Sequence, residues 1–169
     1  PNFWELLVFA AERGHPIGLA TNARIFRYRD LAEHISQYKV SVRSSLYGHM
    51  PELHDRLTQC PGSFEETVKG IANLVDVGCK PVVNIVMLQE NIQHLLDITK
   101  LLLELRVRQI KFSTLIKCSR APSSIPAFDD LREFLEKTIS FASKEHAVIM
   151  LEKSPLCLTK DYVNWHIPE

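Results

Sequence analysis

The stretch KVSVRSS at residues 39–45 places an unusual set of polar side chains on one side of a predicted strand. Side chains alternate along a strand, so its two valines point to one face. The opposite face carries a cation and two hydroxyls, from Ser41, Arg43 and Ser45. The strand ends at Tyr47-Gly48-His49, before a loop and a helix. Polar groups at the carboxyl end of a strand are typical of ligand sites in α/β proteins.

Comparable polar groups recur on the other predicted strands. Asn84 interrupts the apolar run VVNIVM, and Asn22 follows the first strand. Lys111 and Ser113 share one side of a later strand. Burying an unpaired polar group costs about 1–3 kcal/mol, so these groups need partners. A polar or charged ligand would supply them, and mutual hydrogen bonds with ordered waters are the alternative.

His54 and Asp55 are a second candidate for chemistry, because a neighbouring imidazole and carboxylate can act as acid and base. No nucleophile stands beside them, which weakens this hypothesis. His49 and His54 are five residues apart, unlike the i, i+4 spacing of a helical metal pair. We therefore interpret both histidines as solvated loop residues and predict no metal site.

The four cysteines of the chain are scattered, and none has C-x2-C spacing. They are too few for a disulfide framework in 169 residues, which favours a reducing cytoplasm. Cys79 opens an apolar strand and is expected to pack in the core. Cys118 and Cys157 follow strand ends, but two cysteines cannot supply the four thiolates of an iron–sulfur cluster.

The composition is that of an ordinary globular domain, with 46% hydrophobic and 24% charged residues. The 20 basic and 20 acidic side chains cancel, which argues against a nucleic-acid or membrane-surface role. No apolar run reaches the roughly 18 residues of a membrane span, and no signal-peptide pattern occurs. Because residue 1 is proline and a helix follows at once, we expect the chain to be part of a longer protein.

Hydrophobic periodicity predicts one helix followed by repeated strand–helix units. Asn2 and Asn91 are expected to cap their helices, and Ser63 to Glu66 has the pattern of a capping box. The predicted strands are 17–20, 39–45, 81–87, 108–115 and 146–151, and the predicted helices are 3–13, 30–36, 51–57, 63–78, 92–105 and 128–144.

This order predicts an α/β fold with a parallel sheet and right-handed helical crossovers. A curled, open (β/α) barrel and a flat doubly wound sheet both fit it. No G-x-G-x-x-G and no G-x4-G-K-[ST] occurs, so no nucleotide-binding motif supports the flat alternative. The continuous apolar run at 81–87 predicts a strand buried on both faces.

Three stretches resemble the radical S-adenosylmethionine (radical SAM) enzymes: TNARIF at 21–26, residues 41–74, and VNIVMLQENIQHL at 83–95. The resemblance implies a TIM-like partial (β/α) barrel. In that family a C-x3-C-x2-C loop after the first strand binds a [4Fe–4S] cluster, and a GGEP-type turn follows the second strand. Neither motif occurs here. The resemblance therefore implies an incomplete barrel at 1–153, which begins after the second strand, and a tail at 154–169.

The resemblance also assigns roles to individual residues. Arg43, Ser45, Asn84 and Asn22 correspond to the cofactor side of the family's site. His54, Asp55, Lys111 and Ser113 are expected on the substrate side. Ala23 and Arg106 stand where the family has glycines. The Pro-Leu-Cys element at Cys157 resembles one that begins an extension with extra clusters in some members, which makes Cys157 a candidate auxiliary ligand.

The resulting hypothesis is an S-adenosylmethionine-binding barrel from an enzyme that abstracts hydrogen through a 5′-deoxyadenosyl radical. The chain alone is expected to be inactive, because no cluster loop occurs in it. One alternative is a degenerate barrel that serves as a binding or scaffold protein, and another is an α/β enzyme that uses His54 and Asp55.

The expected partners follow from the same resemblance. The longer protein would act on a small molecule or a peptide, in the cytoplasm and away from membranes and nucleic acid. Loss of the first two barrel strands would leave the strand at 17–20 as an exposed edge and uncover one face of the first helix. Such a surface predicts self-association.

Overall fold

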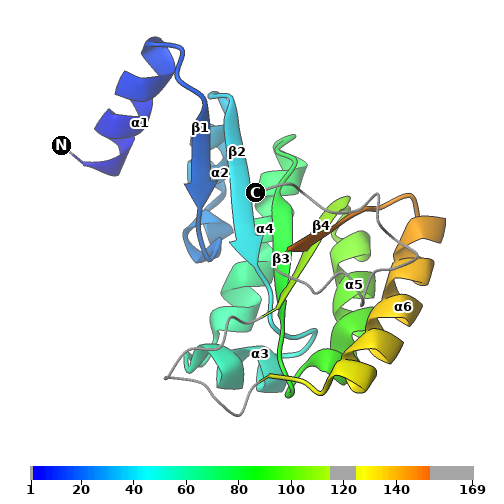
Figure 1. The fold of residues 1–169 in the computed structure, drawn as a ribbon. Helices are drawn as coiled ribbons and strands as arrows, with labels where there is room; N and C mark the ends of the chain where they lie inside the picture. Colours follow the sequence, from blue (N-terminus) through cyan, green and yellow to red (C-terminus); the bar gives the residue numbers. More distant parts are fainter. Residues whose placement is uncertain (1, 115–124, 153–169) are drawn as a thin grey trace.

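The computed structural model describes residues 2–114 and 125–152, and it contains one five-stranded sheet surrounded by helices (Figure 1). The strands are β1 Ile17–Ala20, β2 Val40–Ser45, β3 Val82–Met87, β4 Gln109–Thr114 and β5 Val148–Glu152. The α-helices are α1 Phe3–Glu12, α2 Arg29–Ser36, α3 Pro51–Thr58, α4 Ser63–Asp76, α5 Leu95–Glu104 and α6 Phe128–Lys144, and two short 3-10 helices are η1 Arg24–Arg27 and η2 Ile92–His94.

The strands are all parallel, and their spatial order β1-β2-β3-β4-β5 is their order in the chain. Crossovers between parallel strands are right-handed in nearly all proteins, so a sequential order places every connecting helix on one face. Figure 1 shows α2, α4, α5 and α6 on that face of the curled sheet. A doubly wound sheet needs helices on both faces, so the prediction of an open (β/α) barrel is confirmed and the flat alternative is wrong.

The helix-facing side of the sheet forms the core. Val83, Ile85 and Met87 of β3 are fully buried there, as are Ile110 and Phe112 of β4. The alternate residues of β3 are only half-buried, so the prediction that this strand is buried on both faces is wrong. The reason is that, within residues 2–114 and 125–152, the helices cover only the other face of the sheet. Polar side chains on the inner face are therefore only partly buried.

Two predicted helix caps are replaced by longer-range hydrogen bonds. The side chain of Ser63 does not cap α4, whose N-cap residue is Gly62 in the left-handed conformation. The Asp55 carboxylate accepts hydrogen bonds at this helix start instead. The Asn91 side chain likewise makes no capping bond to η2, because it bridges two loops. The Asn2 capping box at α1, by contrast, is confirmed.

Helix α4 packs directly on the turn after β1. Asn73 donates hydrogen bonds to the carbonyl groups of Phe26 and Arg27. Ala23 adopts a left-handed φ of 61°, and Arg106 a left-handed φ of 62°. Glycine reaches this conformation without strain, which agrees with the glycines that the resemblance implies at both positions.

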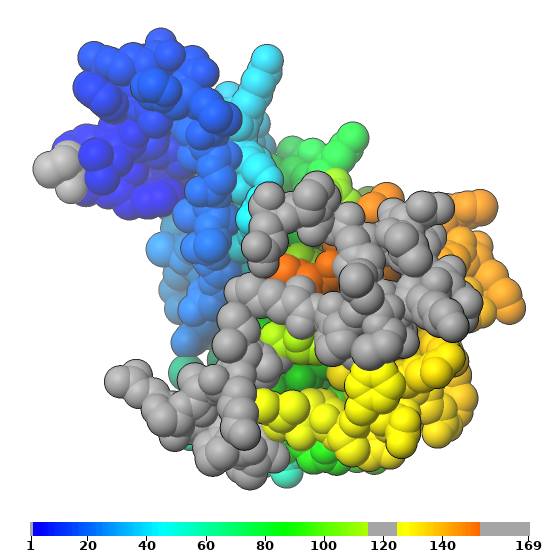
Figure 2. All heavy atoms as spheres, in the orientation of Figure 1, coloured from blue at the N-terminus to red at the C-terminus, as the bar shows by residue number. Residues whose placement is uncertain are grey.

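Helix α1 extends away from the rest of the molecule beside the edge strand β1 (Figure 2). Phe3, Leu6 and Phe9 are about half exposed. The expected edge strand and uncovered helix face are therefore both present. No helix within residues 2–114 and 125–152 is long and apolar enough to cross a membrane. The predicted boundary at 153/154, Cys118 and Cys157 lie outside the described residues.

Candidate functional site

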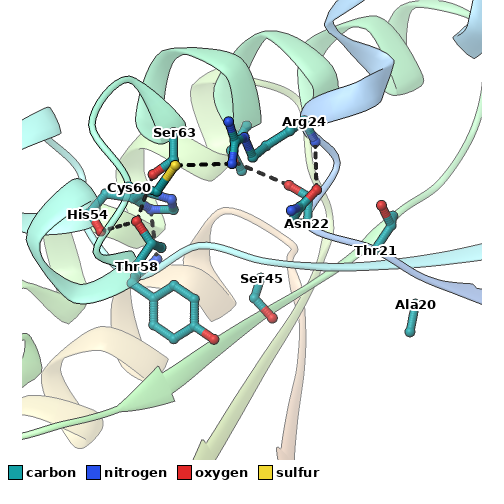
Figure 3. A pocket seen from close by; sticks show the side chains of 11 residues that line it. Ala20, Thr21, Asn22, Arg24, Ser45, His54, Thr58, Cys60 and Ser63 are labelled. Carbon is teal, nitrogen blue, oxygen red and sulfur yellow. Dashed lines mark hydrogen bonds between the residues drawn. The ribbon is translucent and has the colours of Figure 1, made fainter.

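A cavity of about 410 Å³ opens at the carboxyl ends of β1 and β2, between these strands and helices α3 and α4 (Figure 3). Ser45 contributes its hydroxyl from the end of β2, and Asn22 lies at the end of β1. Opposite them, α3, α4 and the loop between them contribute His54, Thr58, Cys60, Ser63 and Thr67. The cavity therefore brings together Asn22, Ser45 and His54, three of the predicted site residues.

A row of polar side chains crosses the sheet beside this cavity. Ser45 pairs in register with Asn84, and Asn84 pairs with Lys111. Residues paired in register on parallel strands project to the same face, so all three side chains share the inner face of the barrel. The Asn84 Oδ1 atom is buried and has no hydrogen-bond partner among the described residues. An unpaired buried carbonyl oxygen is costly, and a ligand that donates a hydrogen bond there would remove that cost.

Arg43 lies on the same face of β2, two residues before Ser45. It is exposed and pairs in register with Ala20 and Val82. Arg43 does not line the cavity. Its guanidinium is therefore available for a carboxylate that binds to the inner face.

Lys111 and Ser113 follow on β4. Lys111 donates to the Glu152 carboxylate at 2.8 Å, which links β4 to β5. The Lys111 side chain is 14% exposed and Ser113 is buried. Lys111 therefore brings a neutralised cation, rather than an unpaired one, to this face.

His54 is 2% exposed, so the prediction that it is a solvated loop histidine is wrong. Its Nδ1 atom accepts a hydrogen bond from the Tyr47 N–H at 3.2 Å, and its ring packs edge-on against Tyr47 and Phe64. Burial lowers the pKa of His54, and the Arg24 charge acts in the same direction against the opposing effect of Asp55. The ring is therefore neutral at pH 7, with its proton on Nε2.

Asp55 organises the start of α4. Its carboxylate accepts from the backbone N–H of Gly62 at 2.6 Å and of Phe64 at 2.7 Å, and from the Ser63 hydroxyl at 2.9 Å. Partial burial opposes ionisation, but these hydrogen bonds outweigh it and hold the pKa of Asp55 below its usual range. His54 and Asp55 thus have separate structural partners, and the geometry does not support an acid–base pair.

Sequence reasoning missed the ion-pair cluster on the far wall of the cavity. Arg24 donates to Glu66 at 2.5 Å and to the Cys60 sulfur at 3.2 Å, and Arg27 also pairs with Glu66. In the sequence, Glu66 fits the pattern of a capping box, which conceals this role. The available signal is the pair of arginines in RIFR, three residues apart in the segment between the first strand and the next helix.

The fold is similar to those of several solved structures. The chain superimposes on Streptococcus suis SuiB with a TM-score of 0.71 at 16% identity, over 95% of this chain and 37% of SuiB. It superimposes on anSMEcpe with bound AdoMet with a TM-score of 0.69 at 17% identity, over 87% of this chain and 43% of that one. A radical SAM methyltransferase from Sphaerobacter thermophilus gives 0.62 at 13% identity, over 84% of this chain and 42% of that one.

The class is therefore an α/β partial barrel of parallel strands. More specifically, the chain has the barrel fold of the radical SAM enzymes, and it spans less than half the length of the solved structures it matches. No family model matches the sequence, and no curated protein matches it. SuiB has been solved with S-adenosylmethionine and with its precursor peptide SuiA, and anSMEcpe with AdoMet and the Kp18Cys peptide.

The described residues fit the two expected cofactors differently. The unpaired Asn84 oxygen, beside the Ser45 hydroxyl, matches a ligand rich in hydrogen-bond donors such as S-adenosylmethionine. A [4Fe–4S] cluster does not fit the two described cysteines. Cys60 lies at the cavity, near the carboxyl ends of the strands, whereas Cys79 precedes β3 at the opposite end of the sheet. Burial raises the pKa of the Cys79 thiol, as expected for a packing residue.

Proposed function

We propose that this chain is the S-adenosylmethionine-binding part of a radical SAM enzyme whose cluster is bound by residues outside this sequence. The unpaired Asn84 oxygen carries the proposal, because it lies beside Ser45 on the inner face of a barrel whose solved relatives bind AdoMet. Ser45 and Asn84 would bind the polar groups of the cofactor, Asn22 would approach it from the end of β1, and Arg43 would neutralise its carboxylate. Together with a cluster, the cofactor supplies hydrogen-abstraction chemistry.

The substrate side would lie along β4 and the loop after β2. Lys111 and Ser113 share the inner face with Ser45 and Asn84. His54 lines the cavity, and Asp55 supports its wall. A peptide or a small molecule is the proposed substrate class, since SuiB and anSMEcpe have been solved with peptides. The scattered cysteines make the cytoplasm the proposed location.

Calorimetric titration with S-adenosylmethionine tests the cofactor role. We expect 1:1 binding, weakened about tenfold by Ser45→Ala or Asn84→Ala, because each change removes one hydrogen bond of about 1.4 kcal/mol. Ser41→Ala is the matched control, since Ser41 projects from the same face of β2 at its exposed amino end. Equal affinities for all four proteins, or no binding, would refute the proposal.

The cluster assignment is tested by iron and acid-labile sulfide analysis after anaerobic reconstitution. We compare this chain with one that includes about 90 further upstream residues of its gene. About four irons per longer chain and none on this one are expected for a cluster bound upstream. No iron on either chain would instead favour a degenerate barrel that serves as a binding or scaffold protein.

A further inference from the structure

Two histidines and an aspartate from two separate segments meet at the rim of the sheet, outside the cavity at β1 and β2. His49 lies in the loop after β2, whereas His94 and Asp97 lie at the start of α5. One ligand-type atom from each side chain lies within 4.8 Å of the other two, and all three residues are half-buried. The His49 and His94 rings are 5.1 Å apart between centroids.

A buried amide holds these two loops together. The Nδ2 group of Asn91 donates to the carbonyl groups of Tyr47 and Val86, both at 3.0 Å, and its Oδ1 accepts from the Leu88 N–H at 2.8 Å. Tyr47 is two residues before His49, and Asn91 is three residues before His94. Asn91 is fully buried, so its hydrogen bonds hold the two segments, and with them the two histidines, in a fixed arrangement at the rim.

One histidine nitrogen in this cluster lacks a partner. His49 Nδ1 is buried and has no hydrogen-bond partner within residues 2–114 and 125–152. Asp97 and His94 each have one ligating atom with a hydrogen-bond partner. Lys100 donates to Asp97 Oδ1 at 3.1 Å, and the Gln93 amide lies 3.4 Å from His94 Nε2. Asp97 and His94 therefore each retain a second ligating atom. The cluster offers two imidazoles and one carboxylate to a cation.

We propose that His49, His94 and Asp97 bind a divalent cation of the zinc type. Two imidazoles and a carboxylate form a ligand set suited to Zn²⁺, with the fourth position open to water. Ligand atoms in a tetrahedral zinc site are about 3.4 Å apart, whereas these atoms lie within 4.8 Å of one another, so the side chains must close by at most about 1.4 Å. His49 lies in the loop that follows β2, and His94 and Asp97 lie in the segment that follows β3. Metal binding would therefore stiffen the carboxyl ends of the two strands that carry Ser45 and Asn84.

This inference goes beyond the proposed function and does not depend on it, because the titration uses metal alone. Cobalt(II) serves as the spectroscopic probe, with zinc as the competitor, on the full chain without a histidine tag. We expect one saturable site with a tetrahedral spectrum, no thiolate charge-transfer band, and displacement by zinc. His49→Ala, His94→Ala and Asp97→Asn should each weaken binding by about tenfold or more. The control His146→Ala removes an exposed histidine and should leave affinity unchanged.

The proposal would be overturned by a thiolate charge-transfer band or by the absence of a 1:1 site. It would also be overturned if the three variants bound cobalt as tightly as the unmodified chain. Circular dichroism establishes that each variant is folded. Histidine ring NMR signals of the unmodified chain give a second readout that needs no variant to fold. Zinc should shift the signals of two histidine rings, and shifts of none, or of histidines other than His49 and His94, would also overturn the proposal.

Discussion

His54 is a buried base whose surroundings keep it neutral. Burial lowers its pKa in the folded chain, whereas the unfolded chain binds a proton near the ordinary value of about 6.5. The unfolded state therefore binds more protons as the pH falls. The contribution of His54 to the free energy of unfolding is therefore fully present above about pH 7.5, and it declines as the pH falls through the unfolded-state pKa.

We therefore expect the free energy of unfolding to decrease between about pH 7 and 5.5, by up to about 1.4 kcal/mol per pH unit for this group. His94, whose pKa is also lowered, chiefly by burial and then by the charge of His49, contributes in the same direction. Urea unfolding at several pH values measures the slope. His54→Asn keeps an acceptor for the Tyr47 N–H but removes the titration, so its slope should be shallower. An unchanged slope in His54→Asn, or a change in the exposed control His15→Gln, would contradict this assignment.

At the scale of elements, the contact between α4 and the turn after β1 determines the shape of the cavity wall. The α4 side chains of Thr67 and Asn73 donate to backbone carbonyl groups of this segment. Gly70 lies between them, where α4 comes closest to the turn. A Cβ atom at Gly70 would lie 2.0 Å from the Ala23 carbonyl oxygen, closer than any contact that the backbone tolerates.

Gly70→Ala should therefore destabilise the chain by about 3 kcal/mol, because backbone must move to admit one methyl group. The urea midpoint measures the loss. Gly18→Ala is the matched control, because a Cβ atom there meets nothing within 4 Å. If the two substitutions changed stability by similar amounts, the close approach of α4 to the turn would be refuted.

At the scale of the whole molecule, the described sheet ends abruptly at β1. Leu6 and Phe9 on α1 are 55% and 53% exposed, beside a strand whose outer edge is unpaired among the described residues. An apolar patch next to a free strand edge is a typical site of association.

We predict concentration-dependent self-association of this chain in sedimentation equilibrium, as the edge strand and α1 suggest. Leu6→Glu should shift the equilibrium toward monomer, because it places a charge in the apolar patch. Ile25→Glu, at a similarly exposed residue on η1, should have no effect. A monomer at all concentrations, or equal effects of the two substitutions, would show that this surface does not drive association.

Sequence periodicity alone predicted the order of the elements and, for β2, which side chains share a face. The alternation at Ser41, Arg43 and Ser45 predicted their common face, and the sequential βα order limited the architecture to parallel sheets. These inferences succeeded because helical and strand periods are local properties of the chain. The left-handed conformation at Ala23 and Arg106 agrees with the positions where glycine was expected.

Only the tertiary structure decided which residues from distant segments meet. His49 and His94 are separated in the chain by 44 intervening residues, yet Asn91 ties their loops together. The Asp55 carboxylate took the role that local spacing assigned to Ser63. Local patterns cannot specify such pairs, because each depends on how strands and crossover helices place two loops at the same rim. Strand periodicity thus oriented Ser45 and Asn84, whereas their register in the sheet made them neighbours.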